Sequence, residues 1–170
     1  MEIIEFINLF KKKVAELNKE GEEIIFSRED KLGDGEITFI FNCAVFDLVK
    51  EHRKNVGLIV ESPIGRGGYS DLTITSPDED LDYIEIEHEN SPENDKGKQL
   101  ENCIKKLSKS KAKTKLLITY YYGKFSVNVL KQSIQKHVNK YFKEEKLYVL
   151  YGPWEGEMKY RKKIFEPSEN

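Results

Sequence analysis

The hydrophobic positions at the start of the chain repeat with the period of a helix. In residues 2–19 apolar side chains recur every three or four positions, and this spacing predicts an amphipathic helix that ends at Gly21. The next two runs, EEIIFSRE and GEITFIF, have the composition of short strands, and the DKLGDG between them suits a turn. We therefore expect a packing helix followed by a β-hairpin over residues 1–41.

The pattern after residue 41 begins with a helix and continues with three strands. Asn42 has a side chain suited to a helix N-cap, and the apolar positions behind it predict a helix to about Lys54. VGLIVES, YSDLTIT and DYIEIEHE have the alternation of strands, and the polar segments PIGRGG and SPDEDLD between them suit turns. Short turns of this kind predict that the three strands pair in antiparallel fashion.

Helices and strands alternate in the remainder of the chain. A stripe of apolar residues predicts a helix over about 98–109, and KLLITYYYG has the continuous apolar run of a strand buried on both faces. A helix from about Ser126 to Phe142 and a strand at KLYVLYG complete the pattern. Helices between strands require crossovers, so the order predicts a single α/β domain with a central mixed sheet flanked by helices. Its parts are the helix and hairpin 1–41, the core 42–122 and a peripheral helix and strand 123–170.

Length and composition place the chain among globular proteins of the cytoplasm. It has 170 residues, and no apolar run approaches the roughly 18 to 20 residues that a membrane span needs. Acids precede the apolar residues of the N-terminus and lysines follow them, the wrong order for a secretory signal. Cys43 and Cys103 each lie in an apolar helical pattern, which predicts buried reduced thiols. We expect a cytoplasmic protein without a membrane partner.

Three glutamates occupy every second position of one predicted strand. Glu85, Glu87 and Glu89 therefore point to the same face, and His88 points to the other face, where packing or hydrogen bonding is its expected role. Like charges on one face disfavour ionisation of one another unless solvent, a cation or a metal ion relieves them. The solvent-facing side of an antiparallel sheet is one explanation. However, a helix and a buried strand follow, which predicts a place near the middle of the sheet.

Asp71, in the preceding predicted strand, can bring a fourth carboxylate to the same place. Carboxylate oxygens alone favour hard cations such as Mg²⁺ or Mn²⁺, and Mg²⁺ usually takes only one or two carboxylates together with water and substrate phosphates. Asp71, Glu87 and Glu85 are the candidate metal ligands. Such an ion can activate a water molecule and neutralise charge on a phosphate, which suits phosphodiester hydrolysis.

The order helix, strand, strand, strand, helix, strand, with an acid in the second strand and an acid-x-acid in the third, resembles the restriction-endonuclease-like, or PD-(D/E)xK, nuclease superfamily. The resemblance covers roughly residues 42–120. It implies that Asp71 of SDL is a metal ligand and that EHE supplies Glu87 and Glu89, with EIE (Glu85 and Glu87) as the other choice. The superfamily usually has a lysine where this chain has the second glutamate, a departure also found in some type II restriction enzymes that keep activity. A glutamate there must act as a metal ligand or a general base.

Lysines are concentrated in one segment of a chain whose net charge is -2. KGKQLENCIKKLSKSKAKTK carries eight lysines and one glutamate, and such a run attracts a polyanion over about a Debye length, on the order of 10 Å. A solvated lysine-rich helix face is the alternative. Lys98, Gln99, Arg66 and Lys105 are the candidate nucleic-acid contacts, and Lys98 or Gln99 could take over the function of the missing lysine.

These observations predict a metal-dependent endonuclease, with DNA favoured over RNA as the substrate and with Asp71, Glu87 and Glu89 as its catalytic residues. The alternative is a non-catalytic nucleic-acid-binding or protein-interaction module with the same fold, which the missing lysine and the acidic net charge permit. A third possibility is an unrelated α/β protein whose acids lie on the surface. Restriction enzymes often dimerise because a symmetric site needs symmetric readers, so a homodimer is compatible with the resemblance.

Overall fold

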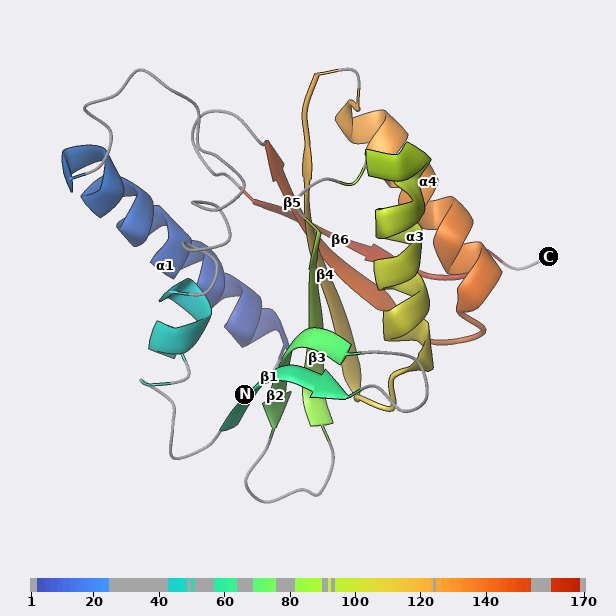
Figure 1. The fold of residues 1–170 in the computed structure, drawn as a ribbon, viewed down its shortest axis with the longest axis horizontal. Helices are drawn as coiled ribbons and strands as arrows, with labels where there is room; N and C mark the ends of the chain where they lie inside the picture. The colour runs from blue at the N-terminus through green and yellow to red at the C-terminus, as the bar shows by residue number, and fades with distance from the viewer. Residues whose placement is uncertain are drawn as a thin grey trace.

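Helices and strands alternate along most of the chain in the computed structural model. It describes residues 3–24, 43–48, 50, 57–63, 69–75, 82–89, 92, 94–123, 125–153 and 160–168. The elements are α1 (Ile3–Ile24), β1 (Gly57–Pro63), β2 (Tyr69–Thr75), β3 (Asp82–Glu89), α3 (Asn94–Lys109), β4 (Thr114–Tyr121), α4 (Val127–Tyr141), β5 (Leu147–Pro153) and β6 (Arg161–Phe165) (Figure 1). Residues 43–48 and 50 are helical as well.

The strands form one mixed sheet in the order β1-β2-β3-β4-β5-β6. Hairpins make β1, β2 and β3 antiparallel neighbours, whereas the crossovers through α3 and α4 make β3, β4 and β5 parallel, and β6 returns antiparallel to β5. β3 is thus paired on both sides, as its sequence context predicts. The predicted α/β class with a central mixed sheet flanked by helices is confirmed.

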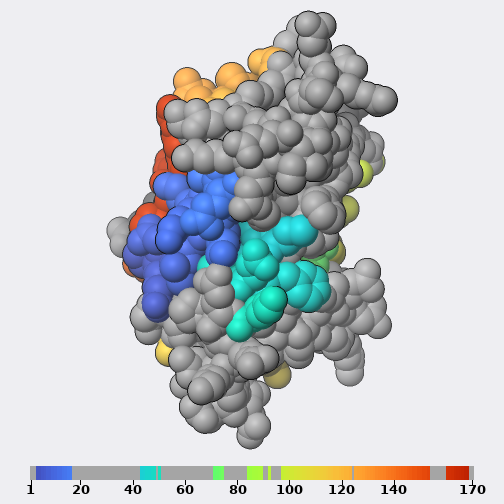
Figure 2. Space-filling model, turned by 90° about the vertical axis from the view of Figure 1, so that its left-hand side faces the viewer, coloured from blue at the N-terminus to red at the C-terminus, as the bar shows by residue number. Residues whose placement is uncertain are grey.

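Two hydrophobic clusters hold the helices against the two faces of the sheet. α1 and helical residues 43–48 cover one face, where they lie side by side (Figure 2), and α3 and α4 cover the other (Figure 1). β4 contributes to both clusters: Leu116 and Ile118 pack toward α1, and Leu117 packs toward α3 and α4. This confirms the prediction of a strand buried on both faces. No helix among the described residues has the length and apolar character needed to cross a bilayer.

Several predicted boundaries are wrong, and glycine is the main reason. α1 continues through Gly21 to Ile24, so the first three residues of EEIIFSRE are helical rather than extended. A single glycine costs a helix only about 1 kcal/mol, which neighbouring turns can offset. α3 begins at Asn94, before the expected Lys98, and includes Gly97 in a left-handed conformation (φ 82°) that glycine adopts without strain.

Strand β6 was not predicted at all. Four of its five residues are exposed, so its sequence RKKIF lacks the alternation that identifies a half-buried strand. The predicted hairpin at 25–41, the end of the helix at 51–54 and the turns at 64–68 and 76–81 lie outside the described residues.

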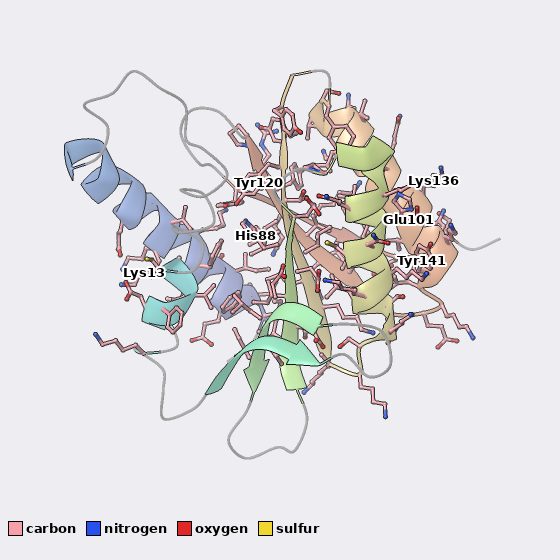
Figure 3. The ribbon with its side chains drawn as sticks, in the orientation of Figure 1. Lys13, His88, Glu101, Tyr120, Lys136 and Tyr141 are labelled. Atoms are coloured by element: carbon pink, nitrogen blue, oxygen red, sulfur yellow. The ribbon has the colours of Figure 1, made fainter. Side chains whose placement is uncertain are left out.

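A chain of hydrogen bonds runs through the cluster on the α1 side. His88 Nε2 lies 2.9 Å from Tyr120 Oη, which lies 2.6 Å from Tyr160 Oη. Figure 3 shows His88 and Tyr120 on this side of the sheet, away from Glu101 and Tyr141 on the α3–α4 side. Burial lowers the pKa of His88 to about 3 and raises that of Tyr120, so all three groups stay neutral. The expected packing and hydrogen-bonding role of His88 is confirmed.

Tyr120→Phe should lower the free energy of unfolding by about 1 to 3 kcal/mol, because it removes the hydroxyl between two buried polar groups. Urea denaturation measures the change. Tyr148→Phe is the matched control, since the Tyr148 hydroxyl makes no hydrogen bond with a described residue and that side chain is only half-buried. Equal stability losses in the two variants would show that the hydrogen-bond chain contributes nothing of its own.

Candidate functional site

The three glutamates of β3 lie on the face that α3 covers, and all three are buried. Their exposed fractions are 3% for Glu85, 0% for Glu87 and 7% for Glu89. The shared face is as predicted. The explanation by a solvent-facing side is wrong for these side chains, and so is that of acids on the surface. Buried carboxylates are costly unless they are paired or hydrogen-bonded, so each needs a partner from the covering helix.

Helix α3 and the residue directly after it supply one partner to each glutamate, because the helix runs back along β3. Two residues advance a strand by about 6.7 Å, and three to four residues advance a helix by about 4.5 to 6 Å, so successive glutamates meet successive turns. Cys103 Sγ lies 3.6 Å from Glu89 Oε2, Lys106 binds Glu87, and Ser110, directly after α3, donates a hydrogen bond to Glu85. We call this set of three contacts the carboxylate ladder.

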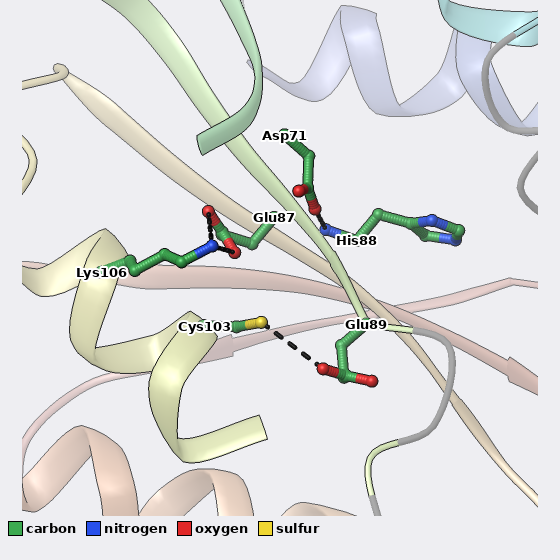
Figure 4. A network of polar contacts seen from close by, with 6 residues as sticks. All are labelled: Asp71, Glu87, His88, Glu89, Cys103 and Lys106. Carbon is green, nitrogen blue, oxygen red and sulfur yellow. Dashed lines mark hydrogen bonds and ion pairs between the residues drawn. The ribbon is translucent and has the colours of Figure 1, made fainter. Parts of the chain in front are cut away.

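The central contact of the ladder is a two-pronged ion pair. Lys106 Nζ lies 2.9 Å from Oε2 and 3.2 Å from Oε1 of Glu87, so one ammonium group binds both carboxylate oxygens (Figure 4). The Glu87 side chain is 1% exposed, whereas that of Lys106 is 32% exposed. The pair therefore connects the buried surface of the sheet with the outer surface of α3.

Asp71 approaches the same place from β2. Its Oδ2 accepts a hydrogen bond of 2.7 Å from the backbone N–H of His88, the residue next to Glu87 (Figure 4). β2 and β3 are antiparallel, with Leu72 opposite Ile86 and Thr73 opposite Glu85, so Asp71 is on the same face as the glutamates. The predicted proximity of Asp71 to the glutamate strand is confirmed.

The charged groups at this place shift one another's pKa values. Burial, and then the negative charge of Asp71, raises the pKa of Glu87 from 4.5 to about 7, although Lys106 opposes the shift. Burial lowers the pKa of Lys106, but its hydrogen bonds and its attraction to Glu87 outweigh burial and leave that pKa raised. At neutral pH Lys106 is charged, and Glu87 titrates. Perturbed titrations of this kind gather at functional sites, although structural ion pairs also produce them.

The contact at Glu89 is weaker and includes a neutral thiol. Burial, together with the charges of Glu87 and Glu89, raises the pKa of Cys103, so its S–H remains and donates to Glu89. Both cysteines are free and Cys103 is buried, as predicted, whereas Cys43 is only half-buried. Thr119 stands opposite Glu89 on β4, and its buried hydroxyl has no hydrogen-bond partner among the described residues.

The contact at Glu85 involves only one of its two carboxylate oxygens. The Ser110 hydroxyl donates to Glu85 Oε2 and accepts a hydrogen bond of 2.9 Å from the Ala112 N–H. Glu85 Oε1 is buried and has no hydrogen-bond partner within the described part of the chain. Buried polar atoms are rarely left in this state, so this oxygen and the Thr119 hydroxyl are places where water or an ion would complete the site.

The other predicted contact residues lie on the outside of α3 or beyond the described residues. Lys98 and Gln99 are exposed near the start of the helix, and Lys105 is exposed with its ammonium 6.0 Å from the centre of the Tyr141 ring. Arg66 lies outside the described residues. Sequence reasoning missed the lysine that binds Glu87. One feature of the sequence could have identified this lysine. Cys103, Lys106 and Ser110 recur at helical spacing, and a helix antiparallel to the glutamate strand would bring them to Glu89, Glu87 and Glu85 in turn.

Asp71 and Glu87 provide carboxylate oxygens, the ligands that a hard cation prefers, but they are only two side chains. Mg²⁺ accepts one or two carboxylates and keeps several waters, and the two acids meet that need. Within the described ranges, however, no three His, Cys, Asp or Glu side chains form a group that could hold a metal ion. A cation at Asp71 and Glu87 would therefore take most of its ligands from water and substrate, and it would compete with Lys106 for Glu87.

Comparison with protein-family models, with curated proteins and with solved structures gives no match. The restriction-endonuclease-like resemblance therefore rests on the order of the elements and on the acids Asp71, Glu87 and Glu89. The contact between Glu87 and Lys106 adds a geometric feature on which a function can be argued.

Glu87→Gln should remove a destabilising contribution that grows with pH. The folded protein holds the Glu87 proton up to a pH of about 7, whereas the unfolded chain releases it near 4.5. Between these values the folded state binds more protons, so the free energy of unfolding falls as the pH rises. Relative to wild type, the variant should gain up to about 3 kcal/mol between about pH 5 and about pH 8. Urea denaturation across this range measures the gain.

Glu101→Gln is the control for this prediction. Hydrogen bonds from Lys140 and then Tyr141 lower the pKa of Glu101 to about 2, so its stabilising contribution is lost only as the pH falls below the ordinary value. Its difference from wild type should stay nearly constant over the same range. A constant difference for Glu87→Gln as well would show that Glu87 does not titrate near neutrality.

Proposed function

We propose that the protein is a divalent-metal-dependent endonuclease with a restriction-endonuclease-like core. The observation that carries the proposal is the convergence of Asp71 from β2, Glu87 from β3 and Lys106 from α3 on one face of the central sheet. Asp71 lies close enough to raise the pKa of Glu87, and Lys106 pairs with Glu87 from the surface side. This arrangement of charges lowers the stability of the fold. Such costs are common where the charges take part in chemistry.

Each residue has a distinct role in this proposal. Asp71 and Glu87 would hold Mg²⁺ or Mn²⁺, which when bound supplies a polarised water and offsets charge on the phosphate. Lys106 favours the charged form of Glu87 and fixes the direction of its carboxylate through two hydrogen bonds. It thereby provides the positive charge that the superfamily usually places on the strand. Glu89 occupies that strand position and remains the candidate general base.

The arrangement of the elements supports the same reading. β1, β2 and β3 are antiparallel neighbours, α3 follows, and β4 returns parallel to β3, which is the order on which the resemblance was based. The site lies on β2 and β3, where the sheet changes from antiparallel to parallel pairing. Glu85 Oε1 and the Thr119 hydroxyl, which have no hydrogen-bond partner among the described residues, add buried polar groups on the same face.

One observation favours a non-catalytic nucleic-acid-binding module instead. Every glutamate of the carboxylate ladder has a partner on or next to α3, so holding the helix on the sheet is sufficient to explain the ladder. The lack of a three-residue metal group among the described residues agrees with this second candidate. In that case the lysines of α3 would bind nucleic acid and no bond would be cut.

A cleavage assay tests the proposal. Purified protein with Mg²⁺ or Mn²⁺ should cut at least one of single-stranded, duplex or branched DNA, and Glu87→Gln should abolish cutting because the amide keeps the shape and removes the charge. Glu89→Gln should also lose activity, whereas Glu85→Gln should keep it. Activity that survives in Glu89→Gln but not in Glu85→Gln would assign the metal to Glu85 and Glu87. Binding of nucleic acid without cleavage by wild type would favour the non-catalytic module.

A further inference from the structure

We propose that a hollow on the outer face of α3 binds the phosphate groups of a nucleic-acid strand beside the Asp71–Glu87 site. This inference deepens the proposed function, because it names the surface that receives the substrate. The hollow has a volume of about 230 Å³ and is lined by Asn102, Lys105, Lys106 and Lys109. These positions are three or four residues apart in pairs, so they share one face of the helix. We call this surface the lysine hollow.

The lysine hollow carries positive charge that the described carboxylates balance only at Lys106. Lysines three and four positions apart on a helix repel one another, which costs stability unless a counter-charge is present. Lys106 is paired with Glu87, but neither Lys105 nor Lys109 has a carboxylate partner among the described residues. The nearby Glu101 is occupied by Lys140 at 2.7 Å and by Tyr141 at 2.5 Å. An external anion is therefore the natural partner.

The lining indicates what kind of anion fits. Ammonium groups and the Asn102 amide offer hydrogen bonds to oxygen acceptors. None of the described residues that line the hollow is apolar or aromatic, the kind of residue on which a base or a drug-like ligand would pack. Lysine binds phosphate as a point charge, without the two-pronged geometry that favours arginine for carboxylates. A phosphodiester strand matches these features, since it presents one charge per nucleotide and several acceptor oxygens.

Lys106 joins the hollow to the acids. It lines the hollow and at the same time binds both oxygens of Glu87. A strand held by Lys105 and Lys109 is thus brought next to two carboxylates that would otherwise repel its phosphates. The lysine hollow offsets this repulsion, which any site that uses acids on a polyanion must overcome.

The test compares two charge-matched double variants. Lys105→Gln/Lys109→Gln removes the hollow's unpaired charges, while Lys11→Gln/Lys136→Gln removes two exposed lysines from α1 and α4. Gln and Lys have similar helix propensity, so both variants should fold. Binding of a fluorescent thymidine oligonucleotide, and of its duplex, is measured by anisotropy at several salt concentrations with EDTA present. Because no metal or cleavage is involved, the outcome is independent of the nuclease proposal.

The hollow variant should bind the oligonucleotide more weakly, and the slope of log K against log salt should shrink by about 1.4, or about 0.7 for each lost phosphate contact on a single strand. The control variant should change much less. Equal slopes for wild type and the hollow variant, or equal losses in both variants, would overturn the proposal. The proposal would also be overturned if a polyglutamate peptide bound wild type as tightly as the oligonucleotide does and lost this binding in the hollow variant. That result would favour an acidic protein partner.

Discussion

The burial of three carboxylates on one face of β3 constrains the rest of this structure. An ionised carboxylate removed from water costs several kcal/mol unless donors replace the lost solvent. Cys103, Lys106 and Ser110 replace the lost solvent at three successive turns. The carboxylate ladder therefore fixes the position of α3 along β3. A shift of the helix by one turn would leave all three acids with the wrong partner. The position of α3 in turn sets the start of β4 and the direction of the lysine hollow.

The opposite face of the sheet anchors the same site in a different way. The backbone N–H of His88 holds Asp71, while the His88 side chain reaches through the α1 side to Tyr120. Tyr120 is completely buried and also contacts Tyr160. The carboxylates therefore rest on a strand that is fixed by polar contacts on one side and by a packed core on the other. A site built on such a strand keeps its geometry when a charged ligand arrives.

Periodicity in the sequence predicted the elements that pack, but not the partners that they find. Spacing by two placed Glu85, Glu87 and Glu89 on one face, and the apolar run of β4 predicted a strand buried on both faces; the structure confirms both. Alternating acids look the same whether water or a helix covers them, so the alternation alone did not predict their burial. Only the expected place of the strand near the middle of the sheet argued against a solvent-facing side. Lys106 was missed because its partner depends on the position of α3 along β3, which is a tertiary property. The glycines at 21 and 97 were misleading because helices tolerate them, and β6 was missed because it is polar.

We propose that Asp71 and Glu87 can hold a divalent cation, although Glu87 also pairs with Lys106. Anomalous diffraction from crystals grown with Mn²⁺ tests it most directly, because manganese scatters anomalously and marks its own position. We expect an anomalous peak in contact with the carboxylates of both Asp71 and Glu87. Well-ordered density for both side chains with the Lys106–Glu87 ion pair intact, and no anomalous peak between the two acids at saturating Mn²⁺, would contradict it.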